Sequence, residues 1–122
     1  MIIALPTADR VGAHEFYPKA FGFEAFGPVA DDGVPEPLQF RLADDLVLML
    51  IPTGGFGWTV NRPVAERGTS EVALSITVDD VDVAFGRAVS AGAEVVAEPE
   101  QKPWAYTAAV ADPDGHVWLL TS

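Results

Sequence analysis

The sequence predicts an α+β fold made of two βαβββ repeats, and three observations lead to this prediction. Short apolar segments alternate with two helical segments along the chain. Each helical segment follows an aspartate and ends at a glycine, the residue types that commonly cap helices. The same order of elements occurs in both halves of the 122 residues, a length typical of one domain.

The first half supplies one strand, one helix and three further strands. Ile2–Thr7 is a compact apolar strand, and Asp9 is expected to cap a helix that reaches about Phe21. Pro18 lies inside this helix, where a proline should kink or shorten it, and Gly22 should end it. Three strands are expected at 23–29, 38–42 and 46–51, with turns at 31–33 and 44–45.

The second half repeats this order. A strand at 72–78 leads to Asp80, which is expected to cap a helix reaching Ala91, and Gly92 should end that helix. Asp80 follows Asp9 by 71 residues and Gly92 follows Gly22 by 70, so one single-residue adjustment aligns the halves. The remaining strands are expected at 93–96, 106–111 and 116–121, with a turn at 112–115.

We therefore expect a first module at 1–51 and a second at 70–122, which together form one domain. A segment rich in glycine and proline, 52–69, connects them and contains Phe56 and Trp58. A loop this long inside a compact domain is often functional. The alternative is a linker whose two aromatic side chains fill the edge of the core.

The composition is that of a globular protein that does not bind nucleic acid. Hydrophobic residues make up 49% of the chain, enough to offset the entropy of ordering. The net charge of −11 argues against binding to a phosphate backbone. It suits a cationic small molecule, although acidity also serves solubility alone. With no cysteine, no signal-peptide pattern and no apolar run long enough for a membrane helix, we expect a cytoplasmic protein.

Three motifs recur in a fixed order. The first helix ends with Phe16-Tyr17 and Phe21-Gly22-Phe23, and the second module opens with Thr77-Val78-Asp79-Asp80. The most specific motif is Asp-Pro-Asp-Gly-His-Val-Trp at 112–118. Together they resemble the vicinal oxygen chelate superfamily of glyoxalases, bleomycin-resistance proteins and extradiol dioxygenases. The resemblance covers nearly the whole chain, and it implies a curved mixed sheet around a cup-shaped cavity and a homodimer.

Active members of that superfamily bind a divalent metal through His and Glu side chains on the first and last strands of each module. The matching positions here are Ile2, Met49, Ala73 and Leu119, with Val72 replacing Ala73 if the register shifts. None of them offers a carboxylate or an imidazole. The resemblance therefore implies a member with no metal, no other cofactor and no metal-dependent catalytic residue.

The strand pattern also indicates which face forms the cup. In the second module Leu74 and Ile76 share a bulky face that suits packing on the helix, whereas Ser75 and Thr77 share a small, mildly polar face. The concave face is expected to carry Ala4, Val47, Met49, Ala73, Ser75, Thr77, Val117 and Leu119. Apolar surface with a few hydroxyls is typical of ligand sites. Alternatively, the small residues let a dimer partner or the connecting segment fill the cup.

Aromatic residues extend the candidate site. Trp104 and Tyr106 are expected to share a face and to join Phe56 and Trp58 in a wall that binds flat or cationic ligands, although core packing is an equal alternative. The predicted ligand-binding residues are Met49, Phe56, Trp58, Ser75, Thr77, Trp104, Tyr106 and Leu119.

The two histidines are the obvious candidates for a rival site. His14 is expected to face solvent from its helix, and His116 to lie on the helix-facing side of its strand. The aspartates at 79–80, 112 and 114 are explained by capping and turn formation without a cation. No hydrolase triad, P-loop or dinucleotide-binding motif is present.

The preferred hypothesis is a metal-free protein that binds a small molecule and sequesters an antibiotic or metabolite. The alternative is a lyase, isomerase or dioxygenase with displaced ligands, for which Glu15, Glu71 or His116 would have to turn inward. A third hypothesis is an interaction domain whose cup is filled by a partner subunit.

Overall fold

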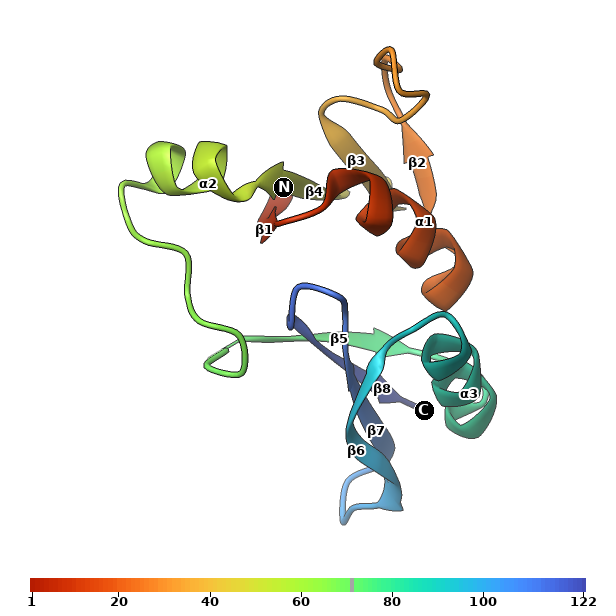
Figure 1. Ribbon diagram of the computed structural model, residues 1–122. Coiled ribbons are helices and arrows are strands. Elements are labelled where there is room, and N and C mark those ends of the chain that lie inside the picture. Colours follow the sequence, from red (N-terminus) through yellow and green to blue (C-terminus); the bar gives the residue numbers. More distant parts are fainter. Residues whose placement is uncertain (71) are drawn as a thin grey trace. The chain divides into compact units, whose positions relative to one another are not determined.

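The computed structural model describes residues 1–70 and 72–122, which form two compact units (Figure 1). Unit 1 contains Met1–Pro18 and Gly22–Val64, and unit 2 contains Lys19–Phe21 and Ala65–Ser122. Each unit has one four-stranded mixed sheet. The predicted α+β fold of two βαβββ repeats is confirmed. No helix in the described ranges is long and apolar enough to cross a lipid bilayer.

Unit 1 has the strand order β1-β4-β3-β2. Its strands are β1 (Ile2–Thr7), β2 (Glu24–Phe26), β3 (Leu38–Ala43) and β4 (Leu46–Pro52), and its helices are α1 (Arg10–Phe21) and α2 (Thr53–Val60). β1 runs parallel to β4, and the other neighbouring strands are antiparallel. A parallel pair needs a long crossover connection. The chain between β1 and β4, including α1, supplies it.

Both predicted caps of α1 are present. The carboxylate of Asp9 accepts a hydrogen bond from the amide of Gly12 at 3.0 Å. Gly22 has φ 73° and donates its amide to the carbonyl of Pro18 at 2.9 Å. Pro18 does not shorten the helix, which continues to Phe21, because a proline in the last turn removes only one backbone hydrogen bond.

The core of unit 1 lies between α1 and the sheet and is largely aromatic. Tyr17 is 1% exposed, and its ring centroid lies 5.3 Å from that of Phe40 and 6.1 Å from that of Phe23. Leu48 and Leu50 of β4 are also buried in this core. Burial of aromatic side chains of this size dominates the free energy of folding of a small unit.

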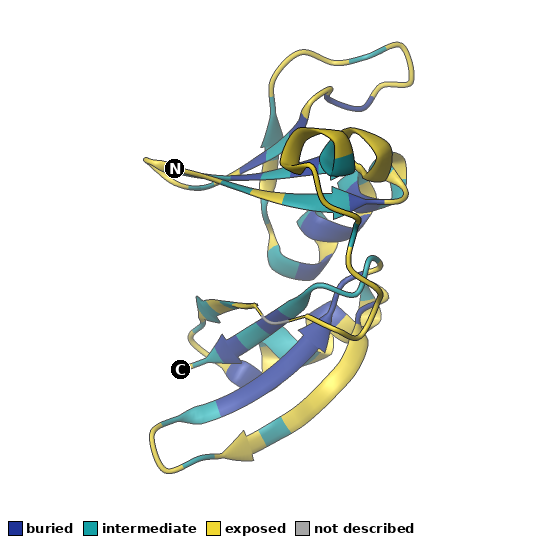
Figure 2. Ribbon diagram, turned by 90° about the vertical axis from the view of Figure 1, so that its left-hand side faces the viewer, coloured by how far each residue is buried: buried dark blue, intermediate teal, exposed yellow. Residues whose placement is uncertain are grey.

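Unit 2 has the equivalent strand order, β5-β8-β7-β6. Its elements are β5 (Ala73–Thr77), α3 (Val81–Ser90), β6 (Glu94–Gln101), β7 (Tyr106–Ala111) and β8 (Val117–Thr121). Asp80 caps α3 by accepting from the amide of Val83 at 3.1 Å, and Gly92 with φ 108° follows the helix. β6 extends well beyond the predicted 93–96 and forms the exposed edge beside the buried β7 (Figure 2).

Two sequence-based predictions in unit 1 are wrong. The strand expected at 23–29 ends at Phe26 because Gly27, with φ 104°, turns the chain, and Val29 makes only an isolated bridge to Pro35. The segment 52–69, expected to be a loop, contains α2. Three glycines within α2 hide it from propensity arguments, since glycine is a poor helix former.

Candidate ligand-binding faces

Each sheet has one face that packs on α1 or α3, and we call the opposite face the open face. In unit 1 the strand register places Ile2 opposite Val47, Ala4 opposite Met49 and Pro6 opposite Ile51. Leu48 and Leu50 point to the other face and are buried. The open face of unit 1 therefore includes Ile2, Ala4, Pro6, Val47, Met49 and Ile51, with Gln39 and Arg41 of β3 beside Met49 and Val47. It is apolar along β1 and β4 and polar along β3, and Ile2 is 55% exposed.

The open face of unit 2 is richer in hydroxyl groups. Ala73 lies opposite Val117, Ser75 opposite Leu119 and Thr77 opposite Thr121. On the next strand, Thr107 lies opposite Thr121 and is 6% exposed. The open face of unit 2 therefore includes Ala73, Ser75, Thr77, Thr107, Ala109, Ala111, Val117, Leu119 and Thr121. Such hydroxyls can donate or accept hydrogen bonds, which suits the orientation of a polar ligand group.

Thr107 and Thr121 were missed by the sequence interpretation. The signal that finds them is the alternation along β7 and β8, in which every second residue shares a face. Once Leu119 is placed on the open face, Thr121 follows on the same strand, and the register then adds Thr107.

A cavity of about 310 Å³ lies in unit 1 where the open face meets the end of the sheet. It is lined by Arg10, Glu36, Pro37, Leu38, Met49, Leu50, Ile51 and Pro52. This volume is at the lower end for small-molecule sites. Met49 and Ile51 belong both to the cavity and to the open face, so the two features are continuous.

Arg10 builds one wall of this cavity. Its guanidinium donates to the carbonyls of Val34 and Pro35 at 3.1 and 2.8 Å and pairs with the carboxylate of Asp32. The Arg10 side chain is 14% exposed, so these bonds fix the loop that carries Glu36. The Glu36 carboxylate, 3.9 Å from Arg10, is 64% exposed and brings negative charge to the cavity.

The structure brings only some of the predicted site residues onto the open faces. Met49 lies on that of unit 1, and Ser75, Thr77 and Leu119 lie on that of unit 2. Phe56 and Trp58 lie on α2, where Phe56 is half-buried and Trp58 is 86% exposed. Trp104 lies in the turn between β6 and β7 and is 76% exposed.

Tyr106 lies on the other face of its sheet from Thr107, in the core packing that the sequence analysis kept as an equal alternative to a place in an aromatic wall. It alternates with Thr107 and packs on the core of unit 2 beside Val81 and Leu120. Its hydroxyl donates to the carboxylate of Asp82 on α3 at 2.8 Å. This hydrogen bond raises the pKa of Tyr106 above its usual value, and burial and the charges of Asp82 and Asp80 raise it further.

A second cavity, of about 320 Å³, lies in unit 2 on the helix-covered face. Its walls include Phe21, Ile76, Val83 and Leu120, together with Arg87, whose guanidinium donates to the carbonyl of Lys19 at 2.8 Å. None of the predicted site residues lines it.

The positions that hold a metal in the superfamily do not fit one here. Ile2 and Met49 lie on the open face of unit 1, and Ala73 and Leu119 lie on that of unit 2. Their side chains are hydrocarbons and one thioether. Zinc, magnesium, manganese and non-haem iron require imidazole or oxygen donors.

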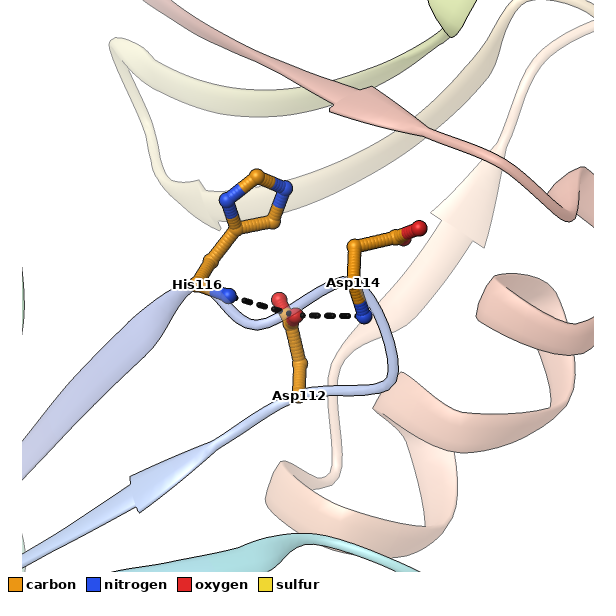
Figure 3. A group of neighbouring side chains, drawn as sticks. All are labelled: Asp112, Asp114 and His116. Atoms are coloured by element: carbon orange, nitrogen blue, oxygen red, sulfur yellow. Dashed lines mark hydrogen bonds between the residues drawn. The ribbon is translucent and has the colours of Figure 1, made fainter. Parts of the chain in front are cut away.

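The described residues contain one group of three metal-type donors, formed by Asp112, Asp114 and His116, whose ligand atoms lie within 4.8 Å of one another. One carboxylate oxygen of Asp112 accepts from the amides of Asp114 and His116 at 3.0 and 2.9 Å (Figure 3). The other accepts from the indole of Trp118 at 3.3 Å. The buried Asp112 thus organises the turn between β7 and β8, as its sequence context predicted.

The described candidates for displaced ligands lie outside the strands that form the open faces. His14 is half-buried on α1 rather than facing solvent, and Glu15 is exposed on the same helix. His116 is half-buried in the turn before β8. Glu71 lies outside the described residues.

Comparison with known proteins places the chain in a family. The family of glyoxalase-like domains matches residues 2–121. The chain belongs to this family. It is thereby a member of the vicinal oxygen chelate superfamily, as its motifs predicted.

Three similar proteins illustrate the range of this glyoxalase-like family. An uncharacterised protein of Mycobacterium bovis is 38% identical over 95% of this chain and 78% of its own length. A glyoxalase-related enzyme from Fulvimarina pelagi has a TM-score of 0.81 with 26% identity, over 98% of this chain and 84% of its own. TnmS3, an antibiotic-binding protein from Streptomyces, has a TM-score of 0.70 with 27% identity, over 98% of this chain and 91% of its own. Similar structures thus include both an enzyme and a binding protein.

Proposed function

We propose that this glyoxalase-like domain binds an organic small molecule on its open faces and does so without a metal. The observation that carries the proposal is the chemistry of the four positions where a metal would be held: Ile2, Met49, Ala73 and Leu119. They replace ionic ligands by apolar side chains that remain accessible. Apolar surface with a few hydroxyl groups is the usual composition of a small-molecule site.

The two open faces differ in the ligand chemistry that each of them suits. Ile2, Val47 and Met49 favour an apolar or aromatic body, since they offer no hydrogen-bonding side chain. Ser75 and Thr77, which are exposed on the open face of unit 2, suit polar groups on a ligand. The structural similarity to an antibiotic-binding protein supports a small organic molecule as the ligand.

A positively charged ligand is favoured over an anionic one. The net charge of −11 attracts cations at long range. At short range the exposed Glu36 carboxylate lies at the cavity beside Met49, whereas the Arg10 guanidinium there is held by Asp32 and two backbone carbonyls.

Metal analysis of protein purified without chelators tests the first half of the proposal. We expect substoichiometric zinc, manganese, iron and nickel by plasma mass spectrometry. One tightly bound ion per chain would contradict metal-free binding and would favour the alternative of a glyoxalase- or dioxygenase-like enzyme.

Ligand binding tests the second half. Native mass spectrometry should reveal any co-purified molecule, and bleomycin, a cationic glycopeptide, is a defined probe for tryptophan fluorescence titration. Met49→Lys should weaken binding at least about tenfold, because it places a cation on the open face. Val96→Lys, at an exposed position on β6, is the matched control and should leave binding unchanged. Equal affinity of both variants would rule out the open face of unit 1 as the site.

Two further expectations accompany this proposal. A homodimer is expected from the family resemblance, and light scattering coupled to gel filtration should give twice the mass of 13.0 kDa. A cytoplasmic location remains a prediction from the sequence.

A further inference from the structure

Helix α2 is built from residues that make a helix weak. It has eight residues, Thr53–Val60, and includes Gly54, Gly55 and Gly57. Isolated helices this short are marginal in water, and each glycine disfavours the helix further. Pro52 at its start provides no capping side chain, and none of its residues is buried.

The two ends of α2 differ in their support. At the C-terminal end, Asn61 adopts the left-handed conformation with φ 56° and its amide donates to the carbonyl of Gly57. The hydroxyl of Thr59 donates to the carbonyl of Gly55 at 2.8 Å. No side chain caps the amides of the first turn, which that bond reaches only at the carbonyl of Gly55. The first turn is therefore the part whose helical state is least secured.

The first turn of α2 also lies next to the open face of unit 1. α2 follows β4 directly and packs against β1 and β4 (Figure 1). A Cβ at Gly55 would lie 3.5 Å from the Cγ2 atom of Ile51, which is an open-face residue. A molecule bound on that face beside Ile51 therefore lies within reach of α2.

Trp58 gives α2 a chemical preference. Its indole is 86% exposed, an unusual state for the largest apolar side chain. Indole faces attract flat aromatic rings by stacking and cations by their π-electrons. A ligand that is both flat and cationic gains from both interactions and from the net charge of the chain.

We propose that α2 is a ligand-ordered segment of the binding site, fully helical only when a flat aromatic cation covers Trp58. This inference rests on the proposed binding function. If α2 is helical in only a fraction of the molecules, the apparent affinity for the ligand is reduced by that fraction. A substitution that stabilises the helix then strengthens binding without adding a contact. If α2 is already fully helical in the free protein, the same stabilisation leaves the dissociation constant unchanged.

Two glycine-to-alanine variants separate these cases. Gly54 in α2 and Gly86 in α3 both have open space where a Cβ would be added. Alanine favours a helix over glycine by about fivefold in population, since the difference is about 1 kcal/mol. Gly54→Ala should therefore lower the dissociation constant of ethidium, a flat aromatic cation, by about threefold to fivefold. Gly86→Ala stabilises a helix outside the site and should leave that constant unchanged.

Trp58→Ala completes the binding experiment. It should raise the dissociation constant of ethidium by about fivefold or more, because the stacking and cation–π interactions are lost. The flat anion 8-anilinonaphthalene-1-sulfonate should bind more weakly than ethidium. If Gly54→Ala and Gly86→Ala bind ethidium equally, ligand-coupled ordering of α2 is wrong. If neither dye binds to the wild-type protein, the proposed ligand class is wrong, and the inference with it.

Hydrogen exchange tests the state of α2 without any ligand. In the free protein the amides of residues 56–60 should exchange at least about tenfold faster than those of residues 84–90 in α3, and Gly54→Ala should slow them about fivefold. Equal protection of the two helices in the free wild-type protein would overturn the inference whatever the outcome of the dye titrations.

Discussion

The two units share strand order and register, but they fill their cores from opposite sides. In the helices, Tyr17 of α1 corresponds to Ala88 of α3, 71 residues later. Both are at most 1% exposed. The largest core side chain of unit 1 therefore comes from its helix, and at the same place in unit 2 the helix contributes only a methyl group.

The sheets show the reverse on their last strands. Leu48 of β4 corresponds to Trp118 of β8, 70 residues later. Leu48 is paired with Phe40, and Trp118 is paired with Val110. All four are at most 2% exposed. Unit 2 thus gains from β8 the volume that unit 1 gains from α1 and β3.

The comparison indicates that the two repeats enclose a similar volume between helix and sheet and fill it with different side chains. Protein interiors are packed to near-crystalline density, so a smaller residue on one side must be matched by a larger one on the other. Tyr17 and Leu48 in unit 1, and Ala88 and Trp118 in unit 2, are two solutions to one packing problem.

The largest expected effect comes from giving unit 1 the helix residue of unit 2. Tyr17→Ala should destabilise the protein by about 3–5 kcal/mol, because Leu48 cannot fill the space that the ring leaves. Urea unfolding followed by circular dichroism measures the loss. Val11→Ala, at a 49% exposed position of the same helix, should change the stability by less than about 0.5 kcal/mol. Similar losses for both variants would contradict the assigned core.

A compensating substitution on β4 should recover part of this loss. Leu48→Trp alone should cost about 1–3 kcal/mol through overpacking. Combined with Tyr17→Ala it should be much less harmful, with a favourable coupling of about 1 kcal/mol or more in a double-mutant cycle. Strict additivity of the two substitutions would show that helix and strand volumes are not exchangeable in unit 1.

The helix caps should give smaller and matching effects in the two units. Asp9 and Asp80 accept amide hydrogen bonds of 3.0 and 3.1 Å from Gly12 and Val83. Asp9→Ala and Asp80→Ala should therefore each cost about 1 kcal/mol in urea unfolding. Replacement by Asn retains a capping oxygen and serves as the control. A difference of more than about 1 kcal/mol between the two alanine variants would break the equivalence of the repeats.

The sequence predicted the parts of this fold that depend on local signals. Aspartate caps and terminal glycines located α1 and α3, and the alternation of residues placed Met49, Ser75, Thr77 and Leu119 on the open faces. Such signals involve only a few neighbouring residues and can therefore be recognised in a single sequence. The exchange of core volume between Tyr17 and Trp118 depends on tertiary packing and has no local signature.

The features that the sequence did not predict also depend on tertiary structure rather than on local signals. α2 was missed because its stability does not come from helix propensity. Tyr106 was grouped with the open-face residues because an aromatic beside a strand suits either face. In the structure it packs on the core of unit 2, and its hydroxyl donates to Asp82, which lies 24 residues away in sequence.

The hydrogen bond between the Tyr106 phenol and the Asp82 carboxylate has no counterpart in unit 1. Its removal should have the smallest effect on stability of the changes considered. The position of α1 that corresponds to Asp82 is Val11, which cannot accept a hydrogen bond. In unit 2 this bond raises the pKa of Tyr106 above the usual 10.0. The neutral phenol is therefore favoured by folding. Its stabilising contribution is fully present below pH 10 and is lost as the pH rises through the raised pKa.

Asp82→Asn should lower the pKa of Tyr106, because it removes both the anionic acceptor and the nearby negative charge. Ultraviolet titration at alkaline pH measures phenolate formation, and Tyr106→Phe identifies which of the two tyrosines titrates. Between pH 10 and the raised pKa, the wild-type protein should lose stability more steeply than Asp82→Asn. An unchanged pKa in this variant would mean that the bond does not hold β7 to α3 in solution, and the two units would then differ only in their cores.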